Sequence, residues 1–250
     1  MMRQILRNMG VVKMLFYFIR HGDPIYNPDS LTEKGKEQAE ALAVRLERAG
    51  IDKIYASSSV RAIQTAEPLA KRLGKDIEIL DWCNENYTFR EFSIEENGER
   101  RWIFQSPQLL KLFLSDEVLS LGHKWFKHSA FKGTQCEQGI IRIARNSDDF
   151  FRSLGYIHNA KERFYEASEP NEMRIALFAH EGFSHVFLPY VLDLPYPVFA
   201  RFEYGHTGMS VIDFRTYSGG MTFAKLMQYS NDSHLYKEGL PTEYNNRIMV

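Results

Sequence analysis

The sequence has 250 residues, of which 44% are hydrophobic and 25% charged, a composition that excludes an intrinsically disordered chain. The 31 basic and 32 acidic side chains give a net charge of -1, which argues against nucleic acid or an anionic membrane as a partner. The sequence lacks both an apolar run of the roughly 18 residues that span a membrane and the apolar core of a signal peptide. Because the chain has only two cysteines, Cys83 and Cys136, we expect a reducing, cytoplasmic location.

The first third of the chain alternates short apolar runs with helical patterns. Residues 14–19 form an unbroken apolar run, which is typical of a strand buried on both faces. A helix is predicted from the N-cap residue Thr32 to Gly50, and a second helix from about Val60 to Leu73, capped by the serines 57–59. Further strands are predicted over 51–56 and 77–80. Strands that alternate with helices indicate an α/β fold with a mostly parallel sheet and helices on both faces.

This alternation stops between about Trp82 and Ser168, a stretch that holds all three tryptophans. Residues 140–165 are predicted as one long helix, interrupted near Gly155. We expect residues 82–168 to be a helical insert that acts as a cap. Its aromatic residues, Trp102 and Trp125 among them, are expected to form the insert's own small core, with contact to the substrate as the alternative for one or two of them. The insert would lie within a single domain over residues 14–250, after an N-terminal extension over residues 1–13, with Met14 as an alternative start of the chain.

The α/β pattern returns with a strand over 173–179, which ends at His180, and with a helix that runs to about Leu192. Two further strands, over 208–214 and 221–227, are close enough in sequence to pair as a hairpin.

Basic and imidazole side chains follow three of the predicted strands: Arg20 and His21, then Arg61, then His180. Ligands of an open parallel sheet bind beyond the carboxyl ends of its strands. If these strands are neighbours, two guanidinium groups and two imidazoles meet in one crevice, where helix N-termini add to the positive field. Such a crevice favours an anion, and phosphate is the natural ligand because arginine binds its oxygens bidentately.

These residues, in this order, resemble the histidine phosphatase superfamily, also called phosphoglycerate mutase-like. Arg20-His21-Gly22 is similar to its defining motif, and Asn27 stands where many members have a phosphate-pocket asparagine. His180-Glu181-Gly182 is similar to the segment with the second catalytic histidine. Two helix segments complete the resemblance: Leu31-Thr32 with Gly35, Gln38 and Ala39, and Arg61-Ala62 with Gln64-Thr65-Ala66. The second of them resembles the family segment that holds the second phosphate-binding arginine. The resemblance as a whole covers roughly residues 14–80 and 173–227.

The sequence departs from the family pattern at two points. Ser58 stands where the family usually has a proline, and the acidic residue after the third strand does not fall at its usual position. Glu85 is our first choice for this acid, with Asp81 and Glu91 as alternatives.

The resemblance implies a phosphatase that hydrolyses a phosphomonoester, a small molecule or a phosphoprotein, through a phosphohistidine. His21 would be the nucleophile, while Arg20, Arg61 and an imidazolium at His180 would stabilise the phosphoryl oxygens. Glu85 would protonate the leaving group. No metal or other cofactor is expected, because the cationic side chains neutralise the phosphoryl group.

Three alternatives remain at this point. The first is phosphoryl transfer of the phosphoglycerate mutase type, which is disfavoured because only three residues separate Asn27 from Leu31, where the mutases have a longer loop. The second is a metal-dependent hydrolase that uses His21, Asp23, His180 and Glu181 as ligands. The third is a non-catalytic phosphate-binding or protein-interaction domain. His206 and His234 are predicted to be structural.

Overall fold

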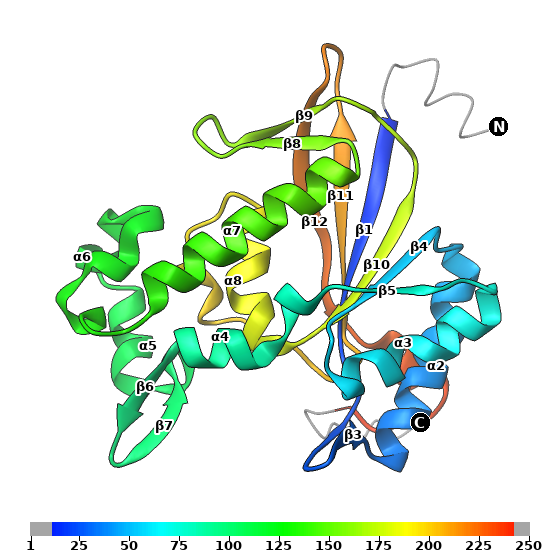
Figure 1. Ribbon diagram of the computed structural model, residues 1–250, viewed down its shortest axis with the longest axis horizontal. Helices are drawn as coiled ribbons and strands as arrows, with labels where there is room; N and C mark the ends of the chain where they lie inside the picture. The colour runs from blue at the N-terminus through cyan, green and yellow to red at the C-terminus, as the bar shows by residue number, and fades with distance from the viewer. Residues whose placement is uncertain (1–11, 243–250) are drawn as a thin grey trace.

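An eight-stranded mixed sheet forms the centre of the computed structural model, which describes residues 12–242 (Figure 1). Four neighbouring strands are parallel, and the other four continue the sheet in antiparallel pairing. In spatial order the strands are β5 (Ile77–Ile79), β4 (Lys53–Ala56), β10 (Arg174–Ala179), β1 (Val12–Arg20), β11 (Met209–Thr216), β12 (Met221–Asn231), β9 (Phe164–Ala167) and β8 (Tyr156–Asn159). The α/β class is confirmed, and the predicted hairpin is the pair β11–β12.

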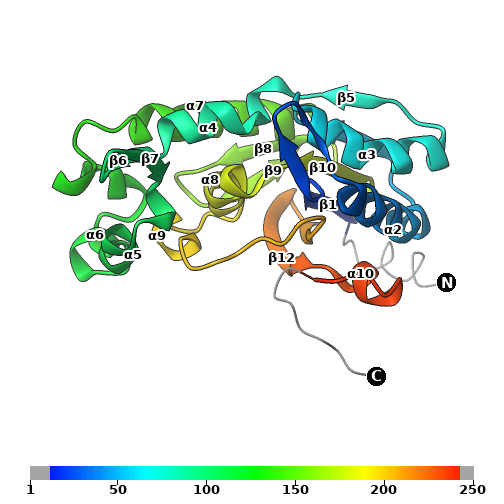
Figure 2. The ribbon, with the colours of Figure 1, turned by 90° about the horizontal axis from the view of Figure 1, so that it is seen from below.

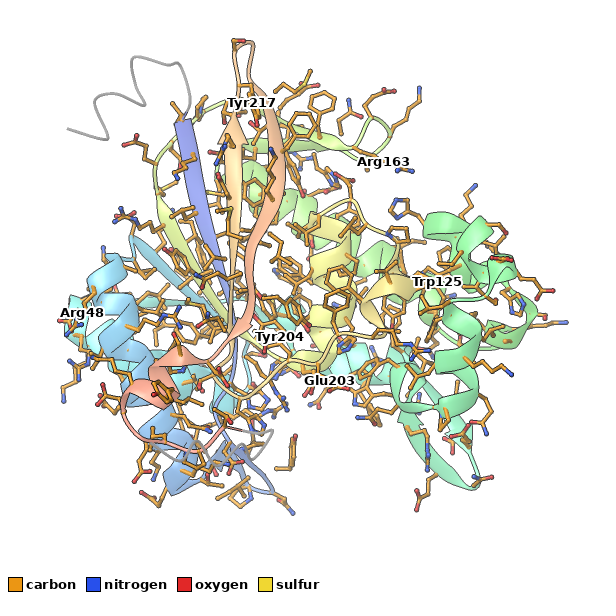
Figure 3. All side chains as sticks on the ribbon, turned by 180° about the vertical axis from the view of Figure 1, so that it is seen from behind. Arg48, Trp125, Arg163, Glu203, Tyr204 and Tyr217 are labelled. Carbon is orange, nitrogen blue, oxygen red and sulfur yellow. The ribbon has the colours of Figure 1, made fainter. Side chains whose placement is uncertain are left out.

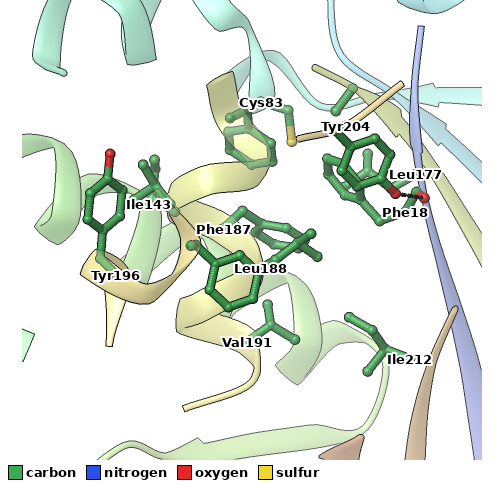
Figure 4. Packing of buried hydrophobic residues seen from close by; sticks show 14 of the residues in the cluster. Phe18, Cys83, Ile143, Leu177, Phe187, Leu188, Val191, Tyr196, Tyr204 and Ile212 are labelled. Atoms are coloured by element: carbon green, nitrogen blue, oxygen red, sulfur yellow. Dashed lines mark hydrogen bonds between the residues drawn. The ribbon is translucent and has the colours of Figure 1, made fainter. Parts of the chain in front are cut away.

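Helices cover both faces of this sheet (Figures 1 and 2). Helices α2 (Glu33–Ala49) and α3 (Val60–Leu73) pack on one face, and α7 (Cys136–Ser153) and α8 (Glu181–Val191) on the other. Alternate residues of β1 pack on the two faces of the sheet, because successive side chains of a strand point to opposite sides. Phe18 packs with Phe187 of α8, whereas Ile19 belongs to the cluster under α2 and α3. Figure 4 shows the packing around Phe18 and Phe187, on the face covered by α7 and α8, at close range.

The local signals for the first two helices are confirmed. Thr32 is the N-cap of α2 and accepts a hydrogen bond from the Gly35 backbone N–H. Gly50 and Gly74 end α2 and α3 in the left-handed conformation, which glycine adopts without steric cost. The cap of α3 differs from the prediction, since Ser59 occupies the N-cap position but its side chain forms no cap bond.

The predicted helix over 140–165 is confirmed up to the interruption predicted near Gly155, and its second part is wrong. Helix α7 ends at Ser153, and Gly155 turns the chain with a φ of 92° into the hairpin β8–β9, which joins the edge of the main sheet. Tyr156 and Tyr165, at the two ends of this segment, are buried beside Phe214 of β11. Long-range packing of these rings therefore overrides the helical pattern.

The stretch between β5 and α7 is only partly helical and lies to one side of the sheet (Figure 1). We call residues 84–131 the cap segment. It contains a hairpin as well as short helices: α4 (Glu85–Glu91), β6 (Ser93–Glu96), β7 (Glu99–Trp102), η2 (Ile103–Gln105), α5 (Pro107–Phe113), α6 (Asp116–Ser120), η3 (Gly122–Lys127) and η4 (Ser129–Phe131).

The remaining short elements are the hairpin β2 (Pro24–Tyr26) and β3 (Asp29–Leu31), η1 (Asp81–Cys83), α9 (Tyr196–Phe199) and α10 (Ser233–Lys237). Strand β1 begins at Val12, two residues before the predicted start, and residues 1–11 of the predicted extension lie outside the described residues. No helix within residues 12–242 is long and apolar enough to cross a membrane.

Candidate active site

The two motif histidines meet at the carboxyl ends of two neighbouring parallel strands. Strands β1 and β10 pair with Arg20 opposite Ala179, so His21 and His180 follow at the same edge of the sheet. Their ring centres lie 5.2 Å apart, and both side chains are buried. The turn after His21 packs against the first turn of α2 so closely that a methyl group on Gly22 would lie 2.7 Å from the Gly35 carbonyl oxygen. Glycine is therefore required beside the histidine.

The contacts of His21 leave its Nε2 atom able to act as a nucleophile. His21 Nδ1 lies 2.7 Å from the Gly22 carbonyl oxygen, which only accepts, so Nδ1 carries the proton and Nε2 keeps its lone pair. Burial, with the charge of Arg20 as a second cause, holds the pKa of His21 well below its usual 6.5. A neutral imidazole with a free Nε2 can attack phosphorus.

The second histidine is held by two hydroxyl groups and a guanidinium. His180 Nε2 lies 2.8 Å from Ser57 Oγ and 3.2 Å from Ser59 Oγ. Arg61 Nη2 donates to His180 Nδ1 at 3.3 Å, so Nε2 carries the proton and donates to a serine hydroxyl. The serines that were predicted to cap α3 therefore contact His180 instead.

The surroundings of His180 favour its neutral form. Burial, followed by the neighbouring His21 and Arg61, holds its pKa well below the usual value. The imidazolium expected from the family resemblance therefore requires an additional anion, since a phosphate dianion beside the ring would raise the pKa of His180.

Two arginines border the histidines, and each forms an ion pair with a carboxylate. Arg20 Nη1 lies 3.1 Å from Glu181 Oε2 and also donates to the Tyr204 carbonyl. Arg61 is largely buried and contacts two acids, with Nη1 2.8 Å from Asp29 Oδ1 and Nη2 3.0 Å from Glu85 Oε2. Both predicted phosphate-binding arginines thus lie at the site, where their guanidinium groups can exchange carboxylate for phosphate oxygens.

Glu85, the first residue of α4, is the candidate acid that reaches the histidines. Its Oε2 lies 3.7 Å from His180 Nδ1, and its Oε1 accepts from the Gly182 backbone N–H at 3.0 Å. Burial raises the pKa of Glu85 above its usual 4.5, although Arg61 acts in the opposite direction. A carboxylic acid that keeps its proton at higher pH is suited to protonate a leaving group.

The other two candidate acids have different surroundings. Asp81 is exposed and accepts hydrogen bonds from Ser58 and Tyr87, which lower its pKa. Glu91 is buried one helical turn and a half beyond Glu85 and binds Arg142 through both carboxylate oxygens, at 2.7 and 2.6 Å. The Glu91 contact joins the cap segment to α7, whereas Asp81 joins the start of α4 to the serine turn before α3.

Asn27 is not brought together with the other site residues. It is exposed at the turn between β2 and β3, and within residues 12–242 its side chain forms no hydrogen bond with them. Asp29, two residues further on, reaches the site instead. Its Oδ2 accepts from the Val60 backbone N–H at 2.8 Å, so one carboxylate caps α3 and pairs with Arg61. The phosphate role of Asn27 stays a prediction.

His206 was predicted to be structural, but it lies at the site. Its ring centre is 5.7 Å from that of His21, and its Nδ1 is 3.6 Å from Asp23 Oδ1. The only sequence signal was its place before a predicted strand, which is too weak to assign a role. His234, by contrast, lies 3.0 Å from Thr207 Oγ1, and burial lowers its pKa to about 3, which fits the predicted structural role.

The site residues could also hold a metal ion by geometry alone. Ligand atoms of His21, Glu85 and His180 lie within 4.8 Å of one another. These three residues differ from the ligands expected for a metal-dependent hydrolase, which included Asp23 and Glu181. Glu181 pairs with Arg20 instead, and Asp23 lies beside His206. Two adjacent guanidinium groups disfavour a cation at this point and favour an anion.

Comparisons with known proteins agree with this architecture. Residues 16–102 match the family model of the histidine phosphatase superfamily (branch 1). The resemblance stated from the motifs is therefore confirmed over this part of the chain. No curated protein sequence matches the chain.

Several solved structures share the fold at low sequence identity. A phosphoserine phosphatase from Entamoeba histolytica is 16% identical with a TM-score of 0.55, over 89% of this chain and 99% of that one. A mycobacterial glucosyl-3-phosphoglycerate phosphatase is 18% identical with a TM-score of 0.55, over 88% and 99%. The α-ribazole phosphatase from Shigella flexneri is 19% identical with a TM-score of 0.56, over 88% and 97%. The phosphoglycerate mutase-like fold is thereby confirmed.

Proposed function

We propose that this protein is a phosphatase that hydrolyses phosphomonoesters through a phosphohistidine on His21. The observation that carries the proposal is the state of His21, a buried neutral imidazole whose Nδ1 is anchored and whose Nε2 is free to react. Arg20 and Arg61 supply charge for the phosphoryl oxygens, and Glu85 supplies a proton at the same place. The phosphatases among the solved structures of this fold support the same reaction class.

The reaction would proceed in two displacements. His21 Nε2 attacks phosphorus while the bond to the leaving oxygen breaks, and Glu85 gives its proton to that oxygen so that an alcohol departs. Glu85, now a carboxylate, then takes a proton from water as the water oxygen attacks phosphorus. The phosphorus–nitrogen bond breaks, and neutral His21 and inorganic phosphate result.

We further infer a small phosphorylated molecule as the substrate, with a phosphoprotein as the alternative, and a cytoplasmic location. Cys83 and Cys136 are both buried free thiols, which fits a reducing compartment. The cluster of His21, Glu85 and His180 favours a metal-dependent hydrolase as the second candidate function. Turnover that survives treatment with a chelator supports the phosphohistidine route, and turnover restored only by an added divalent cation supports the metal route.

Trapping the intermediate tests the proposal directly. Brief incubation with a radiolabelled phosphomonoester and an alkaline quench should place an acid-labile label on the peptide that contains His21. The His21→Asn variant should lose the label and at least about 10³-fold of the turnover, since a nucleophile has no substitute in the first displacement. The His180→Asn variant is the matched control and should slow labelling without moving the label.

Two outcomes would contradict the proposal. Label on His180 would exchange the roles of the two histidines. Turnover at a normal rate without any acid-labile label would exclude a phosphohistidine.

A further inference from the structure

Two aromatic side chains of the cap segment lie beside Glu85. Phe89 is one helical turn after Glu85 on α4, and its ring centre lies 4.9 Å from that of Trp102 in an edge-on arrangement. A methyl group on Gly182 would lie 2.4 Å from Trp102 Cη2 and 3.0 Å from Glu85 Oε1. The indole ring and the carboxylate therefore border the same small space at the start of α8.

Trp102 is held firmly in this position yet remains half-buried rather than enclosed. It stacks on Phe104 with ring centres 5.0 Å apart, and Phe104 stacks on His185 of α8 at 4.0 Å with the rings nearly parallel. These contacts tie the tryptophan to both the cap segment and the central core. A ring fixed in this way can contact a ligand without a further loss of side-chain freedom.

A third aromatic ring contacts the arginine that binds Glu85. Tyr26, in the hairpin β2–β3, is 67% exposed, and the Arg61 guanidinium lies 5.3 Å from its ring centre. Arg61 in turn contacts Glu85 at 3.0 Å. Glu85 is thus linked to Tyr26 through Arg61 and borders Trp102 at Gly182.

The charges around the acid disfavour a second anionic group on the substrate. Arg20 is paired with Glu181, and Arg61 with both Asp29 and Glu85. When a phosphoryl group binds, its oxygens contact both guanidinium groups in place of these carboxylates. A carboxylate on the alcohol part would then meet the negative charges of Asp29 and Glu181, and like charges oppose binding.

We propose that Trp102, together with Phe89 and Tyr26, forms a leaving-group subsite for apolar alcohols, aromatic ones above all. This inference rests on the proposed function, because Glu85 must protonate the leaving oxygen, and the alcohol part therefore lies beside Glu85. The substrate class is a phosphomonoester of an apolar alcohol, in preference to one whose alcohol carries a carboxylate.

A substrate panel tests this selectivity. Benzyl phosphate represents the apolar class, and 3-phosphoglycerate and phosphoserine represent the carboxylate class. The wild type should show the higher kcat/KM for benzyl phosphate. Trp102→Ala should reduce the ratio of kcat/KM values, benzyl phosphate over 3-phosphoglycerate, by about 2–10-fold, the contribution of one aromatic contact. Trp102→Phe should restore most of the ratio.

Phe126→Ala is the matched control, since Phe126 is a half-buried aromatic residue of the cap segment that packs on Trp125. It should leave the ratio unchanged. Binding of benzylphosphonate and phosphonoacetate, which cannot be hydrolysed, gives the same comparison without turnover, and Trp102→Ala should weaken the first more than the second.

The outcomes separate this inference from the proposed function. A wild type that hydrolyses phosphoserine or 3-phosphoglycerate better than benzyl phosphate would overturn the inference and leave the phosphatase proposal standing. Equal losses for all esters in Trp102→Ala and Phe126→Ala would also overturn it. Failure to hydrolyse any phosphomonoester would overturn the proposed function and, with it, the subsite.

Discussion

The parallel part of the sheet and the cap segment are built in different ways. In the parallel part, short-range rules decide the structure: apolar runs form strands, and Thr32, Gly50 and Gly74 begin or end helices. The cap segment depends on contacts between rings that are distant in sequence. Trp125, for example, is fully buried and stacks on Tyr196, while Figure 3 places it among the cap helices, away from Tyr204 beside the sheet.

The proposed active site draws on both parts. The proposed phosphoryl-binding residues Arg20, His21 and His180 lie at the carboxyl ends of the parallel strands, and α3 supplies Arg61. The first helix of the cap segment supplies Glu85, and the hairpin β6–β7 ends at Trp102. In our proposal, the sheet therefore determines the phosphoryl chemistry and the cap segment determines which leaving group departs.

The largest effect expected on the cap side is that of Glu85→Gln. General acid catalysis contributes roughly 10²–10⁴-fold, and less when the leaving group needs no proton. Glu85→Gln should therefore slow the transfer step far more for an alkyl phosphate than for p-nitrophenyl phosphate. Burst kinetics measure the transfer step separately from dephosphorylation.

The pH dependence of kcat/KM is a second test of Glu85 as the general acid. Burial raises the pKa of Glu85, and the pKa of His21 lies well below 6.5, so acid and nucleophile are both in their active states in mildly acidic solution. The kcat/KM for an alkyl phosphate should fall as the pH rises through the raised pKa of Glu85. This alkaline limb should disappear in Glu85→Gln.

Asp81→Asn is the control for Glu85→Gln, because Asp81 is an exposed acid close to the start of α4. It should leave both substrates nearly unaffected. A leaving-group-dependent loss in Asp81→Asn, with Glu85→Gln near wild type, would transfer the acid role to Asp81.

Trp125→Ala should lower stability rather than change the chemistry. The Trp125 ring is fully buried, 4.5 Å from the Tyr196 ring centre and 4.7 Å from that of Phe131. Truncating a buried aromatic residue to alanine costs about 3–5 kcal/mol. Urea unfolding should show this loss, while substrate selectivity of the folded fraction stays that of the wild type.

A changed selectivity in Trp125→Ala, with a stability close to wild type, would contradict this prediction. It would mean that Trp125 contacts the substrate and that the cap core extends into the leaving-group subsite. The half-buried Trp102 is the comparison residue, and Trp102→Ala should lower stability by less than Trp125→Ala does.

Much of the site could be predicted because its residues follow elements with strong local signals. Arg20 and His21 end one apolar run, and His180 ends another, so a parallel pairing of the two strands is sufficient to bring them together. The general acid was harder to predict from the sequence, because Asp81, Glu85 and Glu91 all lie in one polar stretch. Only the direction of α4 places Glu85 toward the sheet and leaves Glu91 against Arg142.

The parts that could not be predicted depend on long-range packing. Tyr156 and Tyr165 lie in a segment of helical pattern, but burial against Phe214 makes this segment a hairpin at the edge of the sheet. The roles of Ser57 and Ser59 were missed for a related reason. Serines before a helix usually cap it, and here the cap comes from Asp29, which lies 31 residues before Val60.

The smallest expected effect is that of Asp29→Asn on phosphate binding. This variant tests how the carboxylate beside Arg61 controls anion affinity. Asp29 Oδ1 lies 2.8 Å from Arg61 Nη1, and a phosphate must compete with this carboxylate for the guanidinium. Asp29 is partly exposed, so water screens its charge, and we expect a contribution of about 0.2–1 kcal/mol, close to that of an exposed ion pair, which is a factor of up to about five. Removing the charge should therefore lower the inhibition constant of inorganic phosphate by up to about fivefold.

Asn is the informative substitution because its side-chain carbonyl can still accept from the Val60 N–H and cap α3. Asp29→Ala removes the cap as well and should lower the free energy of unfolding by about 1 kcal/mol more than Asp29→Asn does. Weaker phosphate inhibition in Asp29→Asn, at unchanged stability, would contradict the competition. Asp29 would then be a positioning residue that holds Arg61 toward the phosphoryl group, and the anion affinity of the sheet side would depend on the hairpin β2–β3.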